Sequence, residues 1–262
     1  MGREKILLDT DIGTEVDDAI TLAYLLANPD AEIMGITTVT GEAAERARLA
    51  REDIPIYPGC ENPIFVPQIE LYAPQKKVLG RWEHQKEFPP NRAVAFMQDV
   101  IRRNPGEITL VCIAPLTNVG LLFAMDPEIA SLLKRIVLMC GSPTYTRYDN
   151  TGETMSAMEK SDVIVLGSKG VIENNALIDP HATKIVYGAD VREHITCGLN
   201  VTSQLIMKPE EAEGLFRHPI LEPVLDIARE WFKDEERVTF HDPLAAVSLF
   251  HDDVCLFEQG DL

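Results

Sequence analysis

Short apolar runs alternate along the chain with longer amphipathic stretches. The runs predict strands at residues 6–8, 32–39, 54–59, 108–113 and 135–140, and the stretches predict helices at 19–26, 42–51 and 92–103. Further helices are expected to begin near Pro115, Asp126, Asp179 and Asp242, where Asp can cap the helix or Pro can occupy its first turn. Strands alternating with helices are typical of a mostly parallel sheet with helices on its faces.

The chain has no sequence repeat, low-complexity tract or linker, so we expect one Rossmann-like α/β domain over residues 1–262. Two long segments without a clear pattern, 61–91 and 141–173, are expected to be lids or disordered. No apolar stretch approaches the ~20 residues that span a bilayer. The formal charge of −18 argues against nucleic acid and anionic membrane surfaces as partners.

The five cysteines are widely spread and form no CxxC pair. Cys112, Cys140 and Cys197 stand in apolar runs, which indicates buried, reduced thiols. The N-terminus enters its first strand directly and leaves no room for a signal peptide. These features predict a cytoplasmic protein.

The most informative segment is the acidic loop Asp9–Ala19, D-T-D-I-G-T-E-V-D-D-A. It follows the first strand and leads into a helix, and ligands of open α/β sheets bind outside the carboxyl ends of strands. Carboxylates crowded there repel one another unless a cation neutralises them, so the loop predicts a site for a hard metal ion. Two structural alternatives stay open, in which Asp17 caps the helix and Asp9 closes the strand.

The acidic loop resembles that of the inosine-uridine-preferring nucleoside hydrolases, in the variant with two extra residues between the glycine and the paired aspartates. The likeness continues in order to about residue 250, which is nearly the whole chain. Its further blocks are Gly35–Val39, Ile108–Val111, Ala114–Asn118, Asp126–Ile129, Arg135–Met139, Glu173–Asn175 with Asp179–Pro180, and His241–Leu244. The resemblance implies the nucleoside hydrolase fold, and hydrolysis of the N-glycosidic bond of a ribonucleoside to free base and ribose.

Carried over by position, the family's metal site implies Ca²⁺ bound by the carboxylates of Asp11, Asp18 and Asp242 and by the backbone carbonyl of Ile113. Ca²⁺ accepts six to eight oxygen ligands in irregular geometry, which suits this set. Asp11 would also be the general base that takes a proton from a metal-bound water. Water activated in this way can attack a ribosyl centre whose transition state resembles an oxocarbenium ion.

The same resemblance implies a substrate pocket with a general acid. His241 would protonate the leaving base, a role that suits a histidine near neutral pH. The residues expected to contact the nucleoside are Asp17, Glu42 and Asn175 at ribose hydroxyls, Glu173 at the 5′ end, and Trp82 and His84 at the base. The expected partners are a small nucleoside and further copies of the chain, as a dimer or tetramer.

Several positions depart from the family pattern. Glu42 replaces a sugar-contacting asparagine, Asn174 replaces an aromatic residue, and Cys140 interrupts a glycine-rich turn before Gly141. Relatives also continue beyond the position of Leu262, so part of the C-terminal edge is expected to be missing. The sequence does not determine the preference between purine and pyrimidine bases.

These departures leave two alternative functions open. The first is a non-catalytic protein that binds ribose or a metal on the same fold. The second is a phosphatase of the haloacid dehalogenase type, because Asp9 and Asp11 after an apolar strand match that superfamily's nucleophile pair. Against the phosphatase, Gly13 stands where a threonine is expected. His241–Pro243 can also be explained simply as a helix start.

Overall fold

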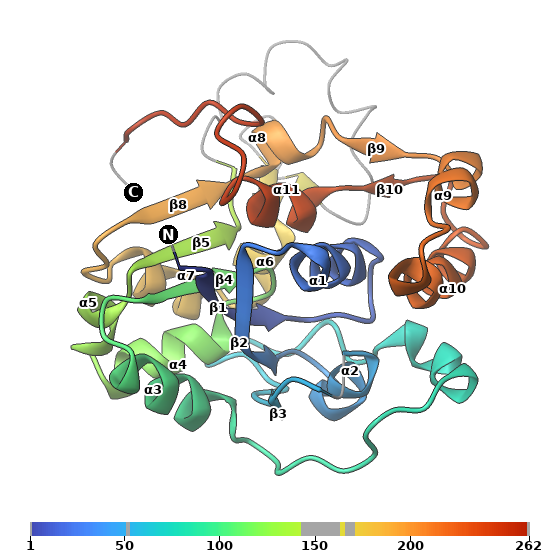
Figure 1. Cartoon of the computed structure of the whole chain (residues 1–262). Helices are drawn as coiled ribbons and strands as arrows, with labels where there is room; N and C mark the ends of the chain where they lie inside the picture. The colour runs from blue at the N-terminus through green and yellow to red at the C-terminus, as the bar shows by residue number, and fades with distance from the viewer. Residues whose placement is uncertain (1, 51–52, 143–162, 166–170, 261–262) are drawn as a thin grey trace.

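One sheet of six parallel strands, in the order β3-β2-β1-β4-β5-β8, forms the centre of the structure (Figure 1). The computed structural model describes residues 2–50, 53–142, 163–165 and 171–260. The strands of the sheet are β1 (Glu4–Thr10), β2 (Ala31–Thr38), β3 (Ile56–Pro58), β4 (Ile108–Cys112), β5 (Arg135–Met139) and β8 (His194–Cys197). The predicted mostly parallel α/β sheet is confirmed.

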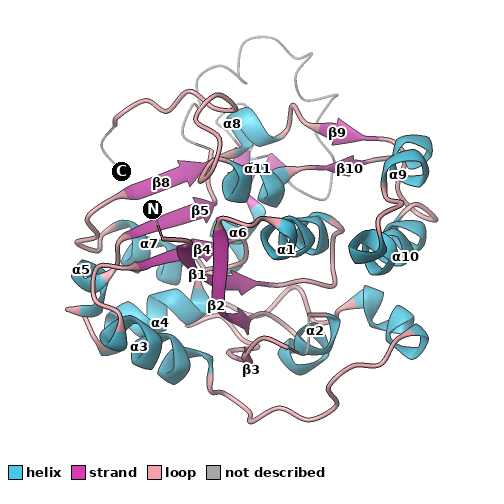
Figure 2. Cartoon of the chain, viewed as in Figure 1, coloured by secondary structure: helices cyan, strands magenta, loops and turns pink. Residues whose placement is uncertain are grey.

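Helices cover both faces of the sheet (Figure 2). One buried cluster joins the sheet to α1 (Asp17–Ala27), α2 (Ala43–Leu49), α8 (Leu199–Thr202), α9 (Pro209–Leu215), α10 (Glu222–Trp231) and α11 (His241–Val247). The other joins it to α3 (Ala93–Arg103), α4 (Thr117–Met125), α5 (Ile129–Leu132) and α7 (Pro180–Tyr187). Along β1, Ile6 and Leu8 belong to the first cluster and Leu7 to the second. Because both faces are covered, the strand is a continuous apolar run.

The order of the strands creates a topological switch point at β1. From β1 the chain continues to β2 on one side of it, and β4, which comes later, pairs on the other side. The loops that follow β1 and β4 therefore diverge at their carboxyl ends, where open α/β sheets bind their ligands. The acidic loop between β1 and α1 occupies this position.

Helix starts were predicted less well than strands. Asp179 caps α7 as expected, accepting a hydrogen bond from the backbone N–H of Ala182 at 3.0 Å. Asp242 does not cap α11, because that helix begins one residue earlier. Asp126 does not start α5, which begins at residue 129, because its carboxylate is bound by Gln98 and Arg102 of α3.

The two long segments contain short elements. Residues 61–91 include the 3₁₀ helix η1 (Pro74–Arg81). Residues 141–173 include the antiparallel pair β6 (Val163–Val165) and β7 (Val171–Glu173), and their stretches 143–162 and 166–170 lie outside the described residues. The remaining elements are α6 (Asn174–Ile178), η5 (Pro219–Leu221) and the antiparallel pair β9 (Ile206–Met207) and β10 (Val238–Thr239).

The cysteine prediction is confirmed, since Cys112, Cys140 and Cys197 are buried free thiols. Burial raises the pKa of all three, which keeps them protonated and unreactive. Within the described residues, every helix is too short or too polar to cross a membrane.

Candidate active site

A small cavity of about 50 Å³ lies at the carboxyl ends of the central strands. Carboxylates dominate its walls, and the described residues that line it include no lysine or arginine. The lining residues are Asp11, Thr14, Glu15, Asp17, Asp18, Glu70, Ile113, Met139, Glu173, Asn174, Asn175, Leu199, His241 and Asp242. Segments far apart in the sequence therefore meet at the switch point. Most of the residues that the sequence nominated lie together here.

The acidic loop is shaped by its own side chains. The Thr10 hydroxyl donates to the Asp18 carboxylate and accepts from the backbone N–H of Ile12 at 3.1 Å. Helix α1 begins at Asp17 and has Val16 as its N-cap, without a side-chain cap. The alternative in which Asp17 caps the helix is therefore wrong. Asp17 and Asp18 instead stand in the first turn, where the helix dipole favours negative charge.

Three carboxylates of this cavity converge on one point. Asp17, Asp18 and Asp242 each offer an oxygen, and these oxygens lie within 4.8 Å of one another. All three residues are buried. The backbone N–H of Asp242 also donates to the Asp17 carboxylate at 3.2 Å, which joins the start of α11 to the start of α1. Sequence reasoning assigned Asp17 to the ribose, and the structure adds it to the acidic cluster.

Burial and mutual repulsion raise the pKa of these carboxyls. The pKa of Asp18 rises to about 8, first through burial and then through the charge of Asp17. The pKa of Asp242 is raised well above its ordinary value by burial and by Asp17, Asp18 and Asp11. Since a shared cation would offset both the cost of burial and the mutual repulsion, the cluster favours binding of a cation.

The donor set fits a hard divalent cation. Ca²⁺ binds oxygen at about 2.3–2.6 Å, so two oxygens on one ion lie within about 5 Å of each other, as in this cluster. Ile113, expected to give a backbone carbonyl, lies directly after β4 and lines the same cavity. Asp17, Asp18, Asp242 and Ile113 could hold the ion, with Asp11 beside them.

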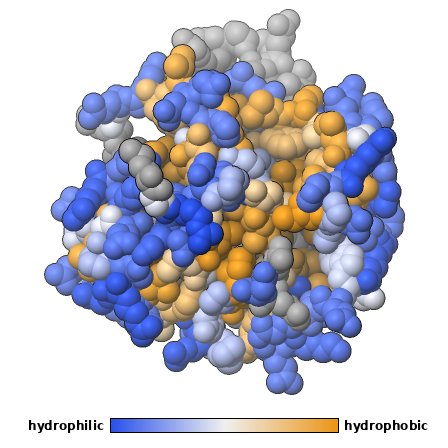
Figure 3. Space-filling view, in the orientation of Figure 1, coloured by the Kyte–Doolittle hydropathy of each residue, from blue (hydrophilic) through white to orange (hydrophobic). Residues whose placement is uncertain are grey.

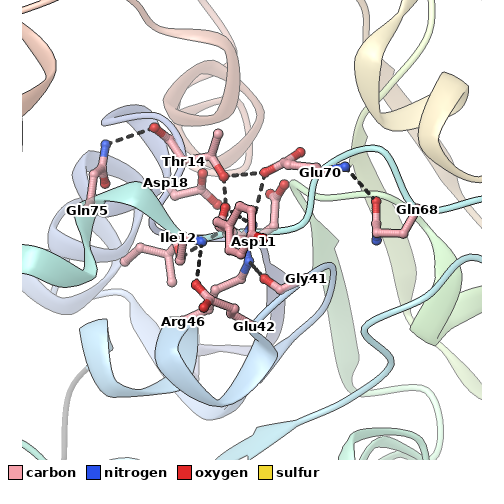
Figure 4. Close-up of polar contacts among 12 residues, drawn as sticks. Asp11, Ile12, Thr14, Asp18, Gly41, Glu42, Arg46, Gln68, Glu70 and Gln75 are labelled. Carbon is pink, nitrogen blue, oxygen red and sulfur yellow. Dashed lines mark hydrogen bonds and ion pairs between the residues drawn. The ribbon is translucent and has the colours of Figure 1, made fainter.

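Asp11 is held through its backbone by a buried arginine (Figure 4). Arg46 of α2 donates from Nη1 to the carbonyl oxygen of Asp11 and to Thr14 Oγ1, at 2.9 Å for the latter. The carboxyl of Asp11 lines the cavity, and its pKa is raised by burial and by the charges of Asp18 and Glu70. The side chain therefore faces the acidic cluster while its main chain is fixed from behind.

His241 begins α11 and is also buried. Its Nδ1 lies 2.7 Å from the hydroxyl of Thr202, which comes from α8. This contact engages Nδ1 and helps to orient the ring. The helix-start explanation of His241–Pro243 is confirmed, and the same helix start carries His241 and Asp242 into the cavity.

Glu173 and Asn175 lie on the wall beyond β5. Glu173 caps α6, and its two oxygens accept from the backbone N–H groups of Asn175, Ala176 and Gly141. Its carboxylate therefore shapes the wall as well as lining it. The Asn175 amide donates to the carbonyl of Met139 at 3.0 Å and is positioned by that contact.

Three nominated residues lie elsewhere. Glu42 accepts from Lys76 and from the backbone N–H of Ala73 at 2.9 Å, so its carboxylate binds η1 and not the cavity. Trp82 and His84 line a second, mainly apolar cavity of about 510 Å³ beside α1 and α10. Figure 3 shows apolar residues gathered on this face of the molecule. The expected contacts of these three side chains with substrate have no support in the arrangement of the described residues.

Asp9, the first acid of the loop, lies outside the cavity lining and has a structural role. Its Oδ1 accepts from the Thr37 hydroxyl at 2.5 Å and from the Asn118 amide at 2.8 Å. Asn118 also donates to the carbonyl of Thr38 and accepts from the backbone N–H of Cys60. This network joins β1, β2 and Cys60, two residues after β3, which agrees with the strand-closing alternative for Asp9.

Sequence reasoning missed Arg46, Glu70 and Thr202. Arg46 is fully buried although it stands in a charged helical stretch, and pattern alone gives no sign of that. Glu70 belongs to the proline-rich segment whose path the pattern did not predict. Thr202 lies in a four-residue helix near the cavity, too short to predict from periodicity.

Known proteins resemble the chain over most of its length. Residues 6–261 match the family described as inosine-uridine preferring nucleoside hydrolase. Uridine nucleosidase 1 of Arabidopsis thaliana is 27% identical over 98% of this chain and 77% of its own. An uncharacterized protein, C1683.06c, of Schizosaccharomyces pombe is 32% identical over 77% of this chain and 63% of its own.

Solved structures show the same fold. A purine-preferring ribonucleoside hydrolase from Gardnerella vaginalis superposes with a TM-score of 0.71 at 21% identity, over 94% of this chain and 79% of that one. The plant nucleoside hydrolase PpNRh1 superposes with a TM-score of 0.69 at 23% identity, covering 94% and 78%. The family match over nearly the whole chain, together with the acidic cavity at the switch point, shows that this chain belongs to the inosine-uridine preferring nucleoside hydrolase family.

Proposed function

We propose that the protein hydrolyses the N-glycosidic bond of a ribonucleoside, releasing the free base and ribose. The observation that carries this proposal is the buried cluster of Asp17, Asp18 and Asp242 in one cavity with Asp11 and His241. Such a cavity combines a cation site, a candidate base and a candidate acid. Family membership supports the same reaction class.

Ca²⁺ is the cation we infer, because every candidate ligand is an oxygen. When bound, a divalent cation would hold ribose hydroxyls and make a nearby water more acidic. Asp11 is the proposed general base, since its carboxyl lines the cavity beside Asp18. It would take the proton from the attacking water, and the surrounding carboxylates would stabilise the positive charge that develops on the ribosyl ring.

The remaining roles follow from the walls of the cavity. His241, with Nδ1 engaged by Thr202, would deliver a proton from Nε2 to the departing base. Asp17 and Asn175 would accept and donate hydrogen bonds at ribose hydroxyls, and Glu173 with Asn175 would define the 5′ end. Attack by water on the face opposite the base would invert the anomeric carbon.

The two alternative functions receive less support. The phosphatase requires a free nucleophilic Asp9, but this carboxylate is buried and bound by Thr37 and Asn118. A non-catalytic binding protein would have no need of a buried histidine oriented beside the acidic cluster. A cytoplasmic location, nucleoside salvage and a dimeric or tetrameric state are further parts of the proposal, and the reduced buried cysteines support the first.

Release of reducing sugar from inosine, uridine, cytidine and adenosine, each with Ca²⁺ and with a chelator, tests this function. Ribose release that stops with the chelator is the expected result. Ca²⁺ binding without turnover of any nucleoside would contradict it and favour the binding protein. Phosphate release from a phosphomonoester, with no ribose formed, would favour the phosphatase.

A further inference from the structure

Glu70 is a carboxylate in the cavity that neither the proposed reaction nor the family pattern above uses. It lies in the segment before η1, and its side chain is 15% exposed. Two groups bind the same oxygen, Oε1: the Thr14 hydroxyl, and Arg46 Nη2 at 3.0 Å. Its backbone N–H also donates to the side chain of Gln68 at 2.9 Å. Figure 4 shows these contacts around Asp11.

The support behind Glu70 is rigid. The Arg46 side chain is fully buried, and it donates to the carbonyl oxygens of Gly41 at 2.9 Å and Tyr72 at 3.3 Å. Gly41 lets the segment approach, because a Cβ there would lie 2.4 Å from the carbonyl oxygen of Glu70. Since both the backbone and Oε1 are fixed, the second oxygen, Oε2, has a defined position. Among the described residues, Oε2 has no hydrogen-bond partner that would occupy it.

The strand order tells which end of the cavity Glu70 occupies. Arg46 and Gly41 follow β2, whereas Glu173 and Asn175 lie beyond β5. The sheet order β2-β1-β4-β5 puts the acidic loop and Ile113 between them. The proposed function assigns the β5 side to the 5′ end of the ribose. The β2 side then receives the part of the nucleoside across the ring from C5′, which is C1′ with its base.

We propose that Glu70 recognises the base by accepting a hydrogen bond at Oε2 from an N–H donor on it. A carboxylate only accepts hydrogen bonds, so it favours bases that present N–H and disfavours those that present a lone pair. Uracil and hypoxanthine present a ring N–H, and adenine and cytosine present an amino group. This inference rests on the proposed function for the orientation of the nucleoside.

The variant E70Q tests the contact with little disturbance. Its amide oxygen can still accept from Thr14 and Arg46, while the amide N–H₂ replaces the acceptor Oε2 with a donor. The matched control is E61Q, the same change at an exposed residue of the same segment. The substrates are uridine with 3-methyluridine, and inosine with 1-methylinosine, because each methyl group replaces the ring N–H. Thermal melts with and without Ca²⁺ show that E70Q folds and keeps its cation site.

In E70Q, kcat/KM for uridine or inosine is expected to fall about 10- to 100-fold, the size of losing a hydrogen bond to a charged acceptor. The methylated nucleoside, which is expected to be a poor substrate of the wild-type protein, should lose no more activity in E70Q than in E61Q. Equal losses on methylated and unmethylated substrates, or no loss, would overturn the proposal while leaving nucleoside hydrolysis intact.

Direct binding separates this proposal from the proposed function. Calorimetric titration of uridine and inosine in the presence of Ca²⁺ is measured for the wild-type protein and for both variants. If the wild-type protein binds these nucleosides without hydrolysing them, and E70Q binds them more weakly, the hydrolase function would be excluded and the role of Glu70 in binding would stand. Neither binding nor turnover of any nucleoside would overturn both.

Discussion

Replacing Arg46 with methionine should strongly destabilise the protein. The guanidinium is fully buried and donates to main-chain carbonyls of Asp11, Gly41 and Tyr72 as well as to Glu70. A buried acceptor that loses its donor costs about 1–3 kcal/mol, and breaking a buried ion pair costs about 3–5 kcal/mol. These terms overlap, and water reaches the partly exposed Glu70. We therefore expect R46M to lose about 4 kcal/mol of the free energy of unfolding.

The assay is urea unfolding with chelator present, so that cation binding does not contribute. At the usual entropy of unfolding per residue, the same loss lowers the melting temperature of a chain of 262 residues by about 7 °C. The matched control is R48M on the same helix, where the side chain is 30% exposed and pairs with Glu45. That partly exposed pair is worth about 1 kcal/mol.

The double variant R46M/E70Q separates the ion pair from the lost hydrogen bonds. Neutralising Glu70 removes the unpaired charge, so the double variant should recover about 1–2 kcal/mol relative to R46M. The reasoning would be refuted if R46M were as stable as R48M. It would also fail if neutralising Glu70 restored nothing, because the buried charge would then not be the source of the loss.

Three further changes test other parts of the structure. D242N should weaken Ca²⁺ binding at least about 100-fold. Ca²⁺ at 100 times its wild-type Kd stabilises the wild-type protein by about 2.7 kcal/mol, and the resulting rise in melting temperature should disappear in the variant when both are compared by calorimetry. An unchanged rise would exclude Asp242 as a ligand. H241A should slow hydrolysis of purine nucleosides about 10²–10⁴-fold but hardly affect ribosides with an activated leaving group, and equal losses on both would remove the general-acid assignment. For His194, burial lowers the pKa, so the unfolded chain binds the proton more readily and the contribution of His194 to stability falls as pH drops below about 6.5. H194F should lack this loss of stability between pH 7 and 5, whereas a variant at exposed His251 should still show it. Parallel curves of stability against pH for the wild type and H194F would contradict the role of His194.

Five of the six strands of the parallel sheet were predictable from their apolar runs, whereas the edge strand β8, which is mostly half-buried, was not predicted. An apolar run such as Ile108–Cys112 is required wherever helices cover both sides of a strand. Helix starts were less predictable, since an Asp before a Pro can cap a helix, as Asp179 does, or serve another partner. The carboxylate of Asp126 pairs with Arg102, which is distant in sequence.

The residues of the site were also predictable where local sequence determined their role, and unpredictable where distant contacts did. Asp11, Asp18 and Asp242 could be named from the sequence because their chemistry is concentrated in short motifs. Glu42 was named for its position in a motif, yet its carboxylate binds Lys76, because η1 packs against the start of α2. Glu70 was not named, since its role depends on how one irregular segment folds over Gly41.

The contact between Asp17 and Asp242 has a consequence for how the chain folds. These residues are 225 positions apart, so the acidic cluster joins the beginning of the domain to its last helix. A cation shared by Asp18 and Asp242 would act as a reversible crosslink, closing a loop whose entropy cost is about 5 kcal/mol. During synthesis the cluster is incomplete until α11 has emerged, so a nascent chain lacking this helix cannot assemble it. Loss of the ion should therefore loosen α11 first, and hydrogen exchange there should report on cation occupancy.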